Sequence, residues 1–138
     1  MTVPRFVDTN VIVYSVLPRP EEMAKRDRAR DVLRSTDLAL STQVLGEFYV
    51  QATRPSRDGP MTHDATVKMI RSLARFPIQP LTFEVVEAAL ATKARFQISY
   101  WDAAIIEAAR AAGCEEVLSE DLADGQDYAG VVVTNPFE

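Results

Sequence analysis

Short apolar segments alternate along the chain with longer segments whose apolar positions recur every three or four residues. The short segments contain the β-branched and aromatic residues typical of strands, and the longer ones have the spacing of amphipathic helices. We therefore expect strands at residues 3–7, 38–40, 76–81, 116–118 and 131–133. Helices are expected at residues 10–17, 21–35, 43–53, 62–75, 82–96 and 99–113.

This alternation of strands and helices predicts an α/β fold with a central, mainly parallel sheet. The expected helices outnumber the expected strands, so some connections between strands should carry an inserted helical hairpin. Ser41 or Thr42, Thr82 and Ser99 are placed to cap helices. The segment RPSRDGP at residues 54–60 is a clear break. No segment is long enough to be a linker to a second domain, so we expect residues 1–138 to form one domain.

The composition excludes several classes of protein. No apolar run approaches the roughly 18 residues that span a bilayer. The N-terminal residues lack the basic and apolar pattern of a signal peptide. Cys114 is the only cysteine, which excludes an internal disulfide, and we expect it to be buried between a helix and a strand. A cytoplasmic location is therefore expected.

Charge is distributed unevenly along the chain, although the net charge is only −5. Residues 1–101 contain 14 basic and 11 acidic side chains, whereas residues 102–138 contain nine acidic side chains and Arg110 alone. The acidic total argues against a nonspecific nucleic-acid binder. It is compatible with an acidic centre that holds cations beside a basic flank. The charges of residues 21–35 are typical of a solvated helix face, and a basic surface for phosphate or a partner is the alternative.

Two aspartates directly follow expected strands. Asp8 lies in FVDTNVIVY after the first strand, and Asp121 lies in VLSEDLADGQDY after the fourth. Ligands of open parallel sheets bind beyond the carboxyl ends of the strands, so these are candidate binding residues. The alternatives are that Asp8 or Thr9 only caps the following helix, and that Asp121 belongs to an acidic surface turn.

Two further acids lie on helices that leave the same edge of the sheet. At about 100° per residue, Glu47 borders the apolar face of its helix, and Asp102 lies within about 20° of Ala109. The apolar face of the second helix is expected to include Trp101, and Glu107 is expected to point away from it. The alternatives are a surface position for Glu47 and a helix-capping role for Asp102 in an S-x-x-D box.

These four acids are expected to converge, which has a chemical consequence. Two carboxylates about 4 Å apart repel by about 4 kcal/mol at an effective dielectric near 20, so a cluster needs protons or cations. A set of oxygen ligands suits Mg²⁺ or Mn²⁺ rather than zinc, and such metals activate water for attack on phosphodiesters. His63, the only histidine, is expected at the surface, which argues against a zinc hydrolase or a Ser-His-Asp triad. Without a glycine-rich phosphate loop, an NTPase is not supported.

Four segments in this order, FVDTNVIVY, LGEFYV, YWDAAIIEAA and LSEDLADGQDYAGVVVTNPF, resemble the PIN-domain ribonucleases, specifically the VapC-like toxins of bacterial toxin–antitoxin pairs. The resemblance covers residues 4–138. It implies a PIN-like three-layer α/β/α fold and an acidic pocket that cuts RNA with Mg²⁺ or Mn²⁺. By resemblance, Asp8, Asp102 and Asp121 would hold the metal. Glu47 would bind the metal or position the attacking water.

The resemblance also implies supporting residues and partners. Asn10 and Ser119 match polar positions that support the pocket, and Asp124 would share or supplement the role of Asp121. The family implies a homodimer that is silenced by a small antitoxin, whose tail enters the pocket, often with an arginine near the acids. RNA would run over the basic side of the molecule, where the candidate residues are Arg26, Arg28, Arg54 and Arg57.

Two other classes of function are compatible with the residues. A phosphatase or phosphoryl-transfer domain would also use an aspartate at a strand end, but the motif DTN lacks the second aspartate of haloacid-type phosphatases. A receiver domain would in addition need a distal lysine near the acids. In the other class, a catalytically silent interaction module, the acids would bind a cation only for stability.

Overall fold

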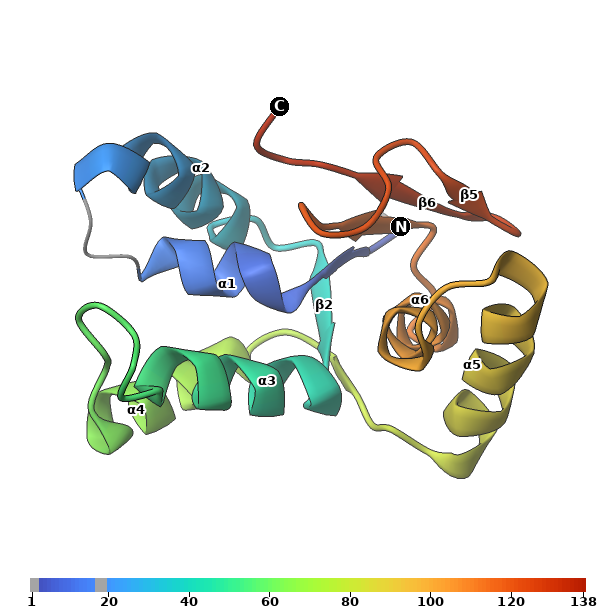
Figure 1. Cartoon of the computed structure of the whole chain (residues 1–138), viewed down its shortest axis with the longest axis horizontal. Helices are drawn as coiled ribbons and strands as arrows, with labels where there is room; N and C mark the ends of the chain where they lie inside the picture. The colour runs from blue at the N-terminus through green and yellow to red at the C-terminus, as the bar shows by residue number, and fades with distance from the viewer. Residues whose placement is uncertain (1–2, 17–19) are drawn as a thin grey trace.

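The computed structural model describes residues 3–16 and 20–138 (Figure 1). The strands are β1 (Arg5–Val7), β2 (Leu38–Ser41), β3 (Ile78–Gln79), β4 (Glu116–Leu118), β5 (Asp127–Tyr128) and β6 (Val131–Thr134). The helices are α1 (Thr9–Ser15), α2 (Met23–Leu33), α3 (Thr42–Thr53), α4 (His63–Leu73), α5 (Phe83–Phe96) and α6 (Tyr100–Ala111), with a 3-10 turn η1 (Pro20–Glu22) before α2. The end of the helix expected at residues 10–17 lies outside the described residues.

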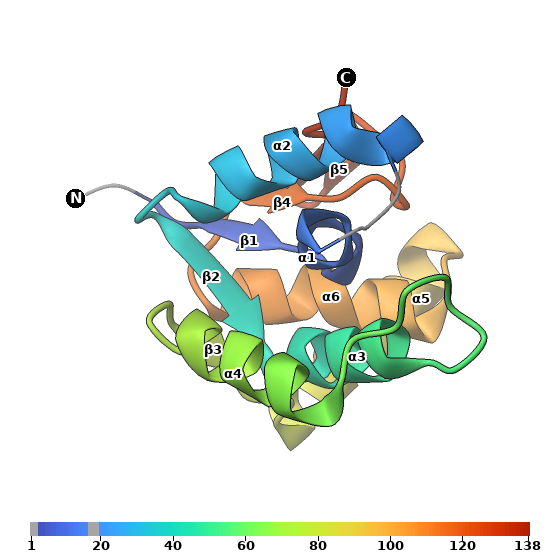
Figure 2. The ribbon, with the colours of Figure 1, turned by 90° about the vertical axis from the view of Figure 1, so that its left-hand side faces the viewer.

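The strands form one sheet in the order β3-β2-β1-β4-β6-β5. All neighbouring strands are parallel except β5, which is antiparallel to β6. Each of the connections from β1 to β2, β2 to β3 and β3 to β4 carries a pair of α-helices, which confirms the prediction of inserted helical hairpins. Figure 2 shows α2 on one side of β1 and α6 on the other. The predicted three-layer α/β/α fold is therefore confirmed.

The path of the chain across the sheet reverses direction at its centre, between β1 and β4. From β1 the chain moves outward through β2 to β3, and it then returns to the other side of β1 with β4. Such a reversal opens a crevice at the carboxyl ends of the two central strands. Val7 pairs with Leu118, so the residues that follow them, Asp8 and Ser119, lie next to each other at this crevice.

The predicted helix caps are found where side-chain oxygens can accept free backbone N–H groups. Ser41, rather than Thr42, accepts a hydrogen bond from the N–H of Val44 and caps α3. Thr82 and Ser99 cap α5 and α6 in the same way. Each cap satisfies a donor that the first turn of a helix leaves unpaired. Cys114 is buried after α6, as expected.

The burial of α6 differs from the expectation in two places. Glu107 was expected to face away from the apolar side, but it is only 6% exposed. The reason is that α6 packs against α5 on one side and against the sheet on the other, so both faces are covered (Figure 1). Trp101 was expected in the apolar stripe, but in the first turn of α6 its side chain is left 57% exposed.

Two smaller differences concern the ends of elements. The strand β5 was not predicted, because two residues are too few to show a period. The helix expected from residue 21 begins as the 3-10 turn and becomes α-helical only at Met23. Among the described residues, no helix is both long and apolar enough to span a membrane.

Candidate active site

Asp8 lies at the crevice between β1 and β4, and its carboxylate is almost completely buried, with 8% exposed. Its Oδ1 accepts the backbone N–H of Thr9 at 2.7 Å, so it caps α1 as one alternative expected. Its Oδ2 accepts the hydroxyl of Ser119 at 2.8 Å. Burial raises the pKa of Asp8 to about 6; the hydrogen bonds from Ser119 and Thr9 lower it, and the charges of Glu47 and Asp121 raise it further.

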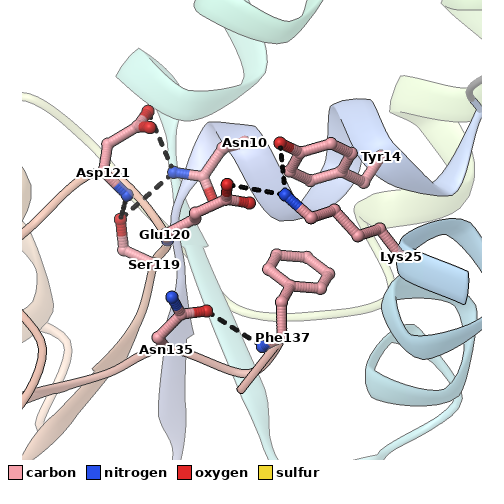
Figure 3. A network of polar contacts seen from close by, with 8 residues as sticks. All are labelled: Asn10, Tyr14, Lys25, Ser119, Glu120, Asp121, Asn135 and Phe137. Carbon is pink, nitrogen blue, oxygen red and sulfur yellow. Dashed lines mark hydrogen bonds and ion pairs between the residues drawn. The ribbon is translucent and has the colours of Figure 1, made fainter. Parts of the chain in front are cut away.

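Ser119 and Asn10 connect Asp8 to Asp121. The side-chain nitrogen of Asn10 lies 3.4 Å from Asp8 Oδ2, 3.1 Å from Ser119 Oγ and 3.2 Å from Asp121 Oδ2. Ser119 also accepts the backbone N–H of Asp121 (Figure 3) and that of Leu122, and these two bonds fix the turn that follows β4. The structure therefore brings Asp8, Asp121, Asn10 and Ser119 together in one hydrogen-bonded network.

Glu47 is half-buried in the second turn of α3 and joins this network through a residue that sequence reasoning did not single out as part of the site. Its Oε2 accepts the hydroxyl of Thr9 at 2.9 Å, and its Oε1 accepts the side-chain amide of Gln43 at 2.8 Å. Gln43 precedes Glu47 by four residues on the same helix, a spacing that brings two side chains together and could have identified it. Thr9 stands between two residues that were identified, Asp8 and Asn10.

Asp102 lies half-buried in the first turn of α6, where Ser99 accepts its backbone N–H at 3.1 Å. Its carboxylate forms no hydrogen bond with any residue that the structure describes. The pKa of Tyr128 is raised by burial and then by the charge of Asp102. The amide nitrogen of Gln43, which donates to Glu47, lies 3.5 Å from the backbone oxygen of Trp101, so the first turn of α6 lies beside the start of α3. No hydrogen bond joins the carboxylate of Asp102 to the other three acids among the described residues.

The described part of the chain, residues 3–16 and 20–138, contains no group of three or more Asp, Glu, His or Cys side chains that could hold a metal ion by itself. Asn10 and Thr9 instead stand between the acids as hydrogen-bond donors. Asp124 has a structural contact, because its Oδ1 accepts the backbone N–H of Asn135 at 2.8 Å.

The four arginines expected to bind RNA lie in two regions of the structure. Arg26 and Arg28 lie on α2, and Arg28 donates to the backbone oxygen of Pro136 at 2.9 Å. Arg54 and Arg57 follow α3. Arg54 lines a hollow of about 450 Å³ that also includes Glu47, so this arginine shares a surface with one of the acids.

Fold and site together define a class: a three-layer α/β protein with a network of carboxylates at the switch point of its sheet. The PIN domain model matches residues 5–123, and the chain belongs to the PIN-domain family. This membership supports a nuclease. A search of curated proteins found no match.

Three solved structures share the fold at low sequence identity. A toxin-antitoxin complex from Klebsiella pneumoniae is 20% identical, with 97% of this chain and 98% of that chain covered and a TM-score of 0.68. FitAcB from Neisseria gonorrhoeae is 21% identical, covers 96% and 98% of the two chains, and has a TM-score of 0.71. Mycobacterium tuberculosis VapC20, described as a Sarcin-Ricin loop cleaving toxin, is 21% identical over 85% and 91%, with a TM-score of 0.65.

Proposed function

We propose that this chain is a metal-dependent endoribonuclease and the toxin of a toxin–antitoxin pair. The observation that carries the proposal is the network of Asp8, Asn10, Ser119 and Asp121 at the switch point of a PIN-domain sheet, with Glu47 joined through Thr9. The names of two solved structures with this fold, a toxin-antitoxin complex and a Sarcin-Ricin loop cleaving toxin, give further support.

The chemistry of the site fits a divalent cation. Its candidate ligands are all carboxylate oxygens, which Mg²⁺ and Mn²⁺ prefer. The carboxylate of Asp8 is buried and is influenced by the charges of Glu47 and Asp121, and a cation would offset both effects. When bound, the cation would supply Lewis-acid stabilisation of a phosphate oxygen and lower the pKa of a water.

The residues of this chain have separate roles in the proposal. Asp8, Asp102 and Asp121 hold the metal, and Glu47 binds it or orients the attacking water. Asn10 and Ser119 orient the carboxylates of Asp8 and Asp121 through their hydrogen bonds. Asp124 acts beside Asp121 in a supplementary role. Because like charges repel, Glu47 and Asp102 would join the other two acids only where the charge of a cation compensates theirs.

The proposed RNA path crosses the surface of α3. Arg54 and Glu47 line the same hollow, so a phosphate bound to Arg54 would lie beside the acidic pocket. Arg57, Arg26 and Arg28 would extend the basic path along the RNA backbone, which proteins recognise through positive charge.

Two protein partners belong to the proposal: a second copy of the chain and an antitoxin that brings a basic side chain to the acidic pocket. Large apolar side chains that are exposed in the single chain, among them Phe83, Leu90 and Trp101, are candidates for covered surfaces. Light scattering that gives the mass of one chain would contradict the homodimer.

The test is to incubate the purified chain, free of any co-purified antitoxin, with RNA. We expect cleavage with Mg²⁺ or Mn²⁺ and none with EDTA. The competing function is a silent interaction module, in which the acids bind a cation only for stability. Absence of cleavage of every RNA tested, with cation binding retained, would support that module instead.

A further inference from the structure

The segment that carries Asp121 is held from two sides. On the side of the pocket, Asn10 Oδ1 accepts the backbone N–H of Glu120 at 3.1 Å, and the Asn10 amide donates to Asp121. On the other side, the side chain of Glu120 extends to α2, where its Oε1 lies 2.8 Å from Nζ of Lys25 (Figure 3). Glu120 and Asp121 are therefore adjacent acids whose side chains have different partners.

Lys25 is itself fixed by several contacts. Its Nζ donates to the hydroxyl of Tyr14 at 3.3 Å and lies 4.8 Å from the centre of the Tyr14 ring. It also lies 5.8 Å from the centre of the Phe137 ring, which packs edge to face against Tyr14. An ammonium held by two aromatic rings and a hydroxyl has few other orientations. Lys25 thus joins α1, α2 and the C-terminal segment to Glu120.

Lys25 supplies the ion pair that compensates the charge of Glu120. Its side chain is 26% exposed, and its second oxygen, Oε2, is buried without a hydrogen-bond partner among the described residues. Without Lys25, an uncompensated carboxylate would stand one residue from Asp121. It would repel Asp121 and displace that carboxylate from the position in which the Asn10 amide holds it.

We propose that Lys25 is a positioning residue of the acidic pocket. By holding Glu120 against α2, it keeps this fifth carboxylate out of the pocket and leaves Asp121 directed toward it. Lys25 touches neither metal nor RNA and acts through Glu120. The inference rests on the proposed function, because it concerns how that site binds its divalent cation.

The experiment measures the binding of Mn²⁺ to the full, metal-free chain by electron paramagnetic resonance of the free ion. Lys25→Met should raise the Kd for Mn²⁺ about 10-fold, the effect typical of residues that orient metal ligands. Lys25→Arg should retain most of the affinity. The matched control is Arg34→Met, which breaks the 2.8 Å ion pair between Arg34, at the C-terminal end of α2, and Asp31, and it should leave the Kd unchanged.

A second substitution separates positioning from a general structural role. If Lys25 acts through the charge of Glu120, adding Glu120→Gln to Lys25→Met should restore most of the lost affinity. Thermal unfolding followed by circular dichroism verifies that each variant folds. If Lys25→Met does not fold, the exchanged pair Lys25→Glu with Glu120→Lys carries the test, and it should bind Mn²⁺ as the wild-type chain does.

Each outcome decides a different claim. An unchanged or lower Kd in Lys25→Met, a loss that Glu120→Gln does not relieve, or loss of affinity in the exchanged pair would overturn the role of Lys25. If the wild-type chain binds Mn²⁺ and Asp8→Asn does not, any of these results leaves the proposed function standing. If the wild-type chain binds no Mn²⁺, both the proposed metal site and the role of Lys25 are overturned.

Discussion

Asp8 is a carboxylate that the fold keeps away from water. Burial raises its pKa from 3.8 to about 6, so the native chain retains this proton at pH values where the unfolded chain has lost it. Between pH 3.8 and about 6 the unfolded chain therefore binds fewer protons, and the free energy of unfolding falls as the pH rises through this range. Above it, the ionised carboxylate costs the metal-free fold about 3 kcal/mol.

Asp8→Asn should stabilise the metal-free chain by roughly 1–3 kcal/mol at pH 7.5, because an amide still caps α1 but carries no charge. The gain should shrink at pH 4.5, where Asp8 is protonated in the native chain. Urea unfolding in EDTA at both pH values measures it. A wild-type chain that is the more stable of the two at pH 7.5 would contradict this account.

Asp102 is the candidate acid that the hydrogen-bond network does not include. If it holds the metal, Asp102→Asn should weaken Mn²⁺ binding and RNA cleavage by at least about 10-fold. Since its carboxylate forms no hydrogen bond with a described residue, the free energy of unfolding should change by no more than about 0.5 kcal/mol. Calorimetric titration with Mn²⁺ and urea unfolding give the two values.

Asp124→Asn is the comparison for Asp102→Asn, because the carboxylate of Asp124 already accepts a hydrogen bond from the backbone N–H of Asn135. Asp124→Asn should therefore have a smaller effect on Mn²⁺ binding than Asp102→Asn has. Equal affinities of the Asp102 variant and the wild-type chain would remove Asp102 from the site.

Individual site residues differ in how far the sequence alone could identify them. Asp8 and Asp121 follow strands, so the rule that parallel sheets bind ligands at their carboxyl edge made them candidates, with a helix cap and a surface turn as the alternatives. The position of Ser119 beside Asp8 follows from the pairing of Val7 with Leu118, which the structure shows. By contrast, Lys25 and Glu120 are 95 residues apart and meet only because α2 packs beside the end of β4, which no local pattern encodes.

At the scale of elements, α6 shows why a helical wheel can mislead. The wheel assumes that one face of a helix is covered, whereas α5 and the sheet cover two faces of α6. Glu107 is therefore buried, and it is stabilised by hydrogen bonds from Thr92 on α5 and from Arg110. Arg110 in turn donates to the backbone oxygens of Tyr128 and Ala129. The helix caps and the strands other than β5 were predictable because their signals are local.

This buried cluster predicts a large effect on stability. Glu107→Ala should lower the free energy of unfolding by about 2 kcal/mol, because it removes the partners of Thr92 and Arg110. Urea unfolding measures the loss. Arg34→Ala is the control, since its ion pair with Asp31 is exposed and should contribute less than about 1 kcal/mol. Equal losses of the free energy of unfolding in the two variants would show that the cluster does not stabilise the packing of α5 against α6.

At the scale of the whole molecule, the proposed RNA path can be tested through the uneven distribution of charge. Reversing the charges of Arg54 and Arg57 to glutamate should slow cleavage at low RNA concentration about 10-fold and weaken its dependence on salt. The matched control is the reversal of Lys68 and Arg71, which lie on α4 and line a different hollow. Initial cleavage rates at several salt concentrations provide the comparison. Intact cleavage by the Arg54 and Arg57 variant would count against this path.

The central claim is that the acids at the switch point of the sheet cleave RNA with a divalent cation. Its most direct test compares the cleavage rates of the wild-type chain and of Asp8→Asn at saturating Mn²⁺, using protein purified free of partners. The account predicts cleavage by the wild-type chain, loss of that cleavage in EDTA, and no cleavage by Asp8→Asn although the variant is folded. Metal-dependent cleavage that survives in Asp8→Asn would contradict it.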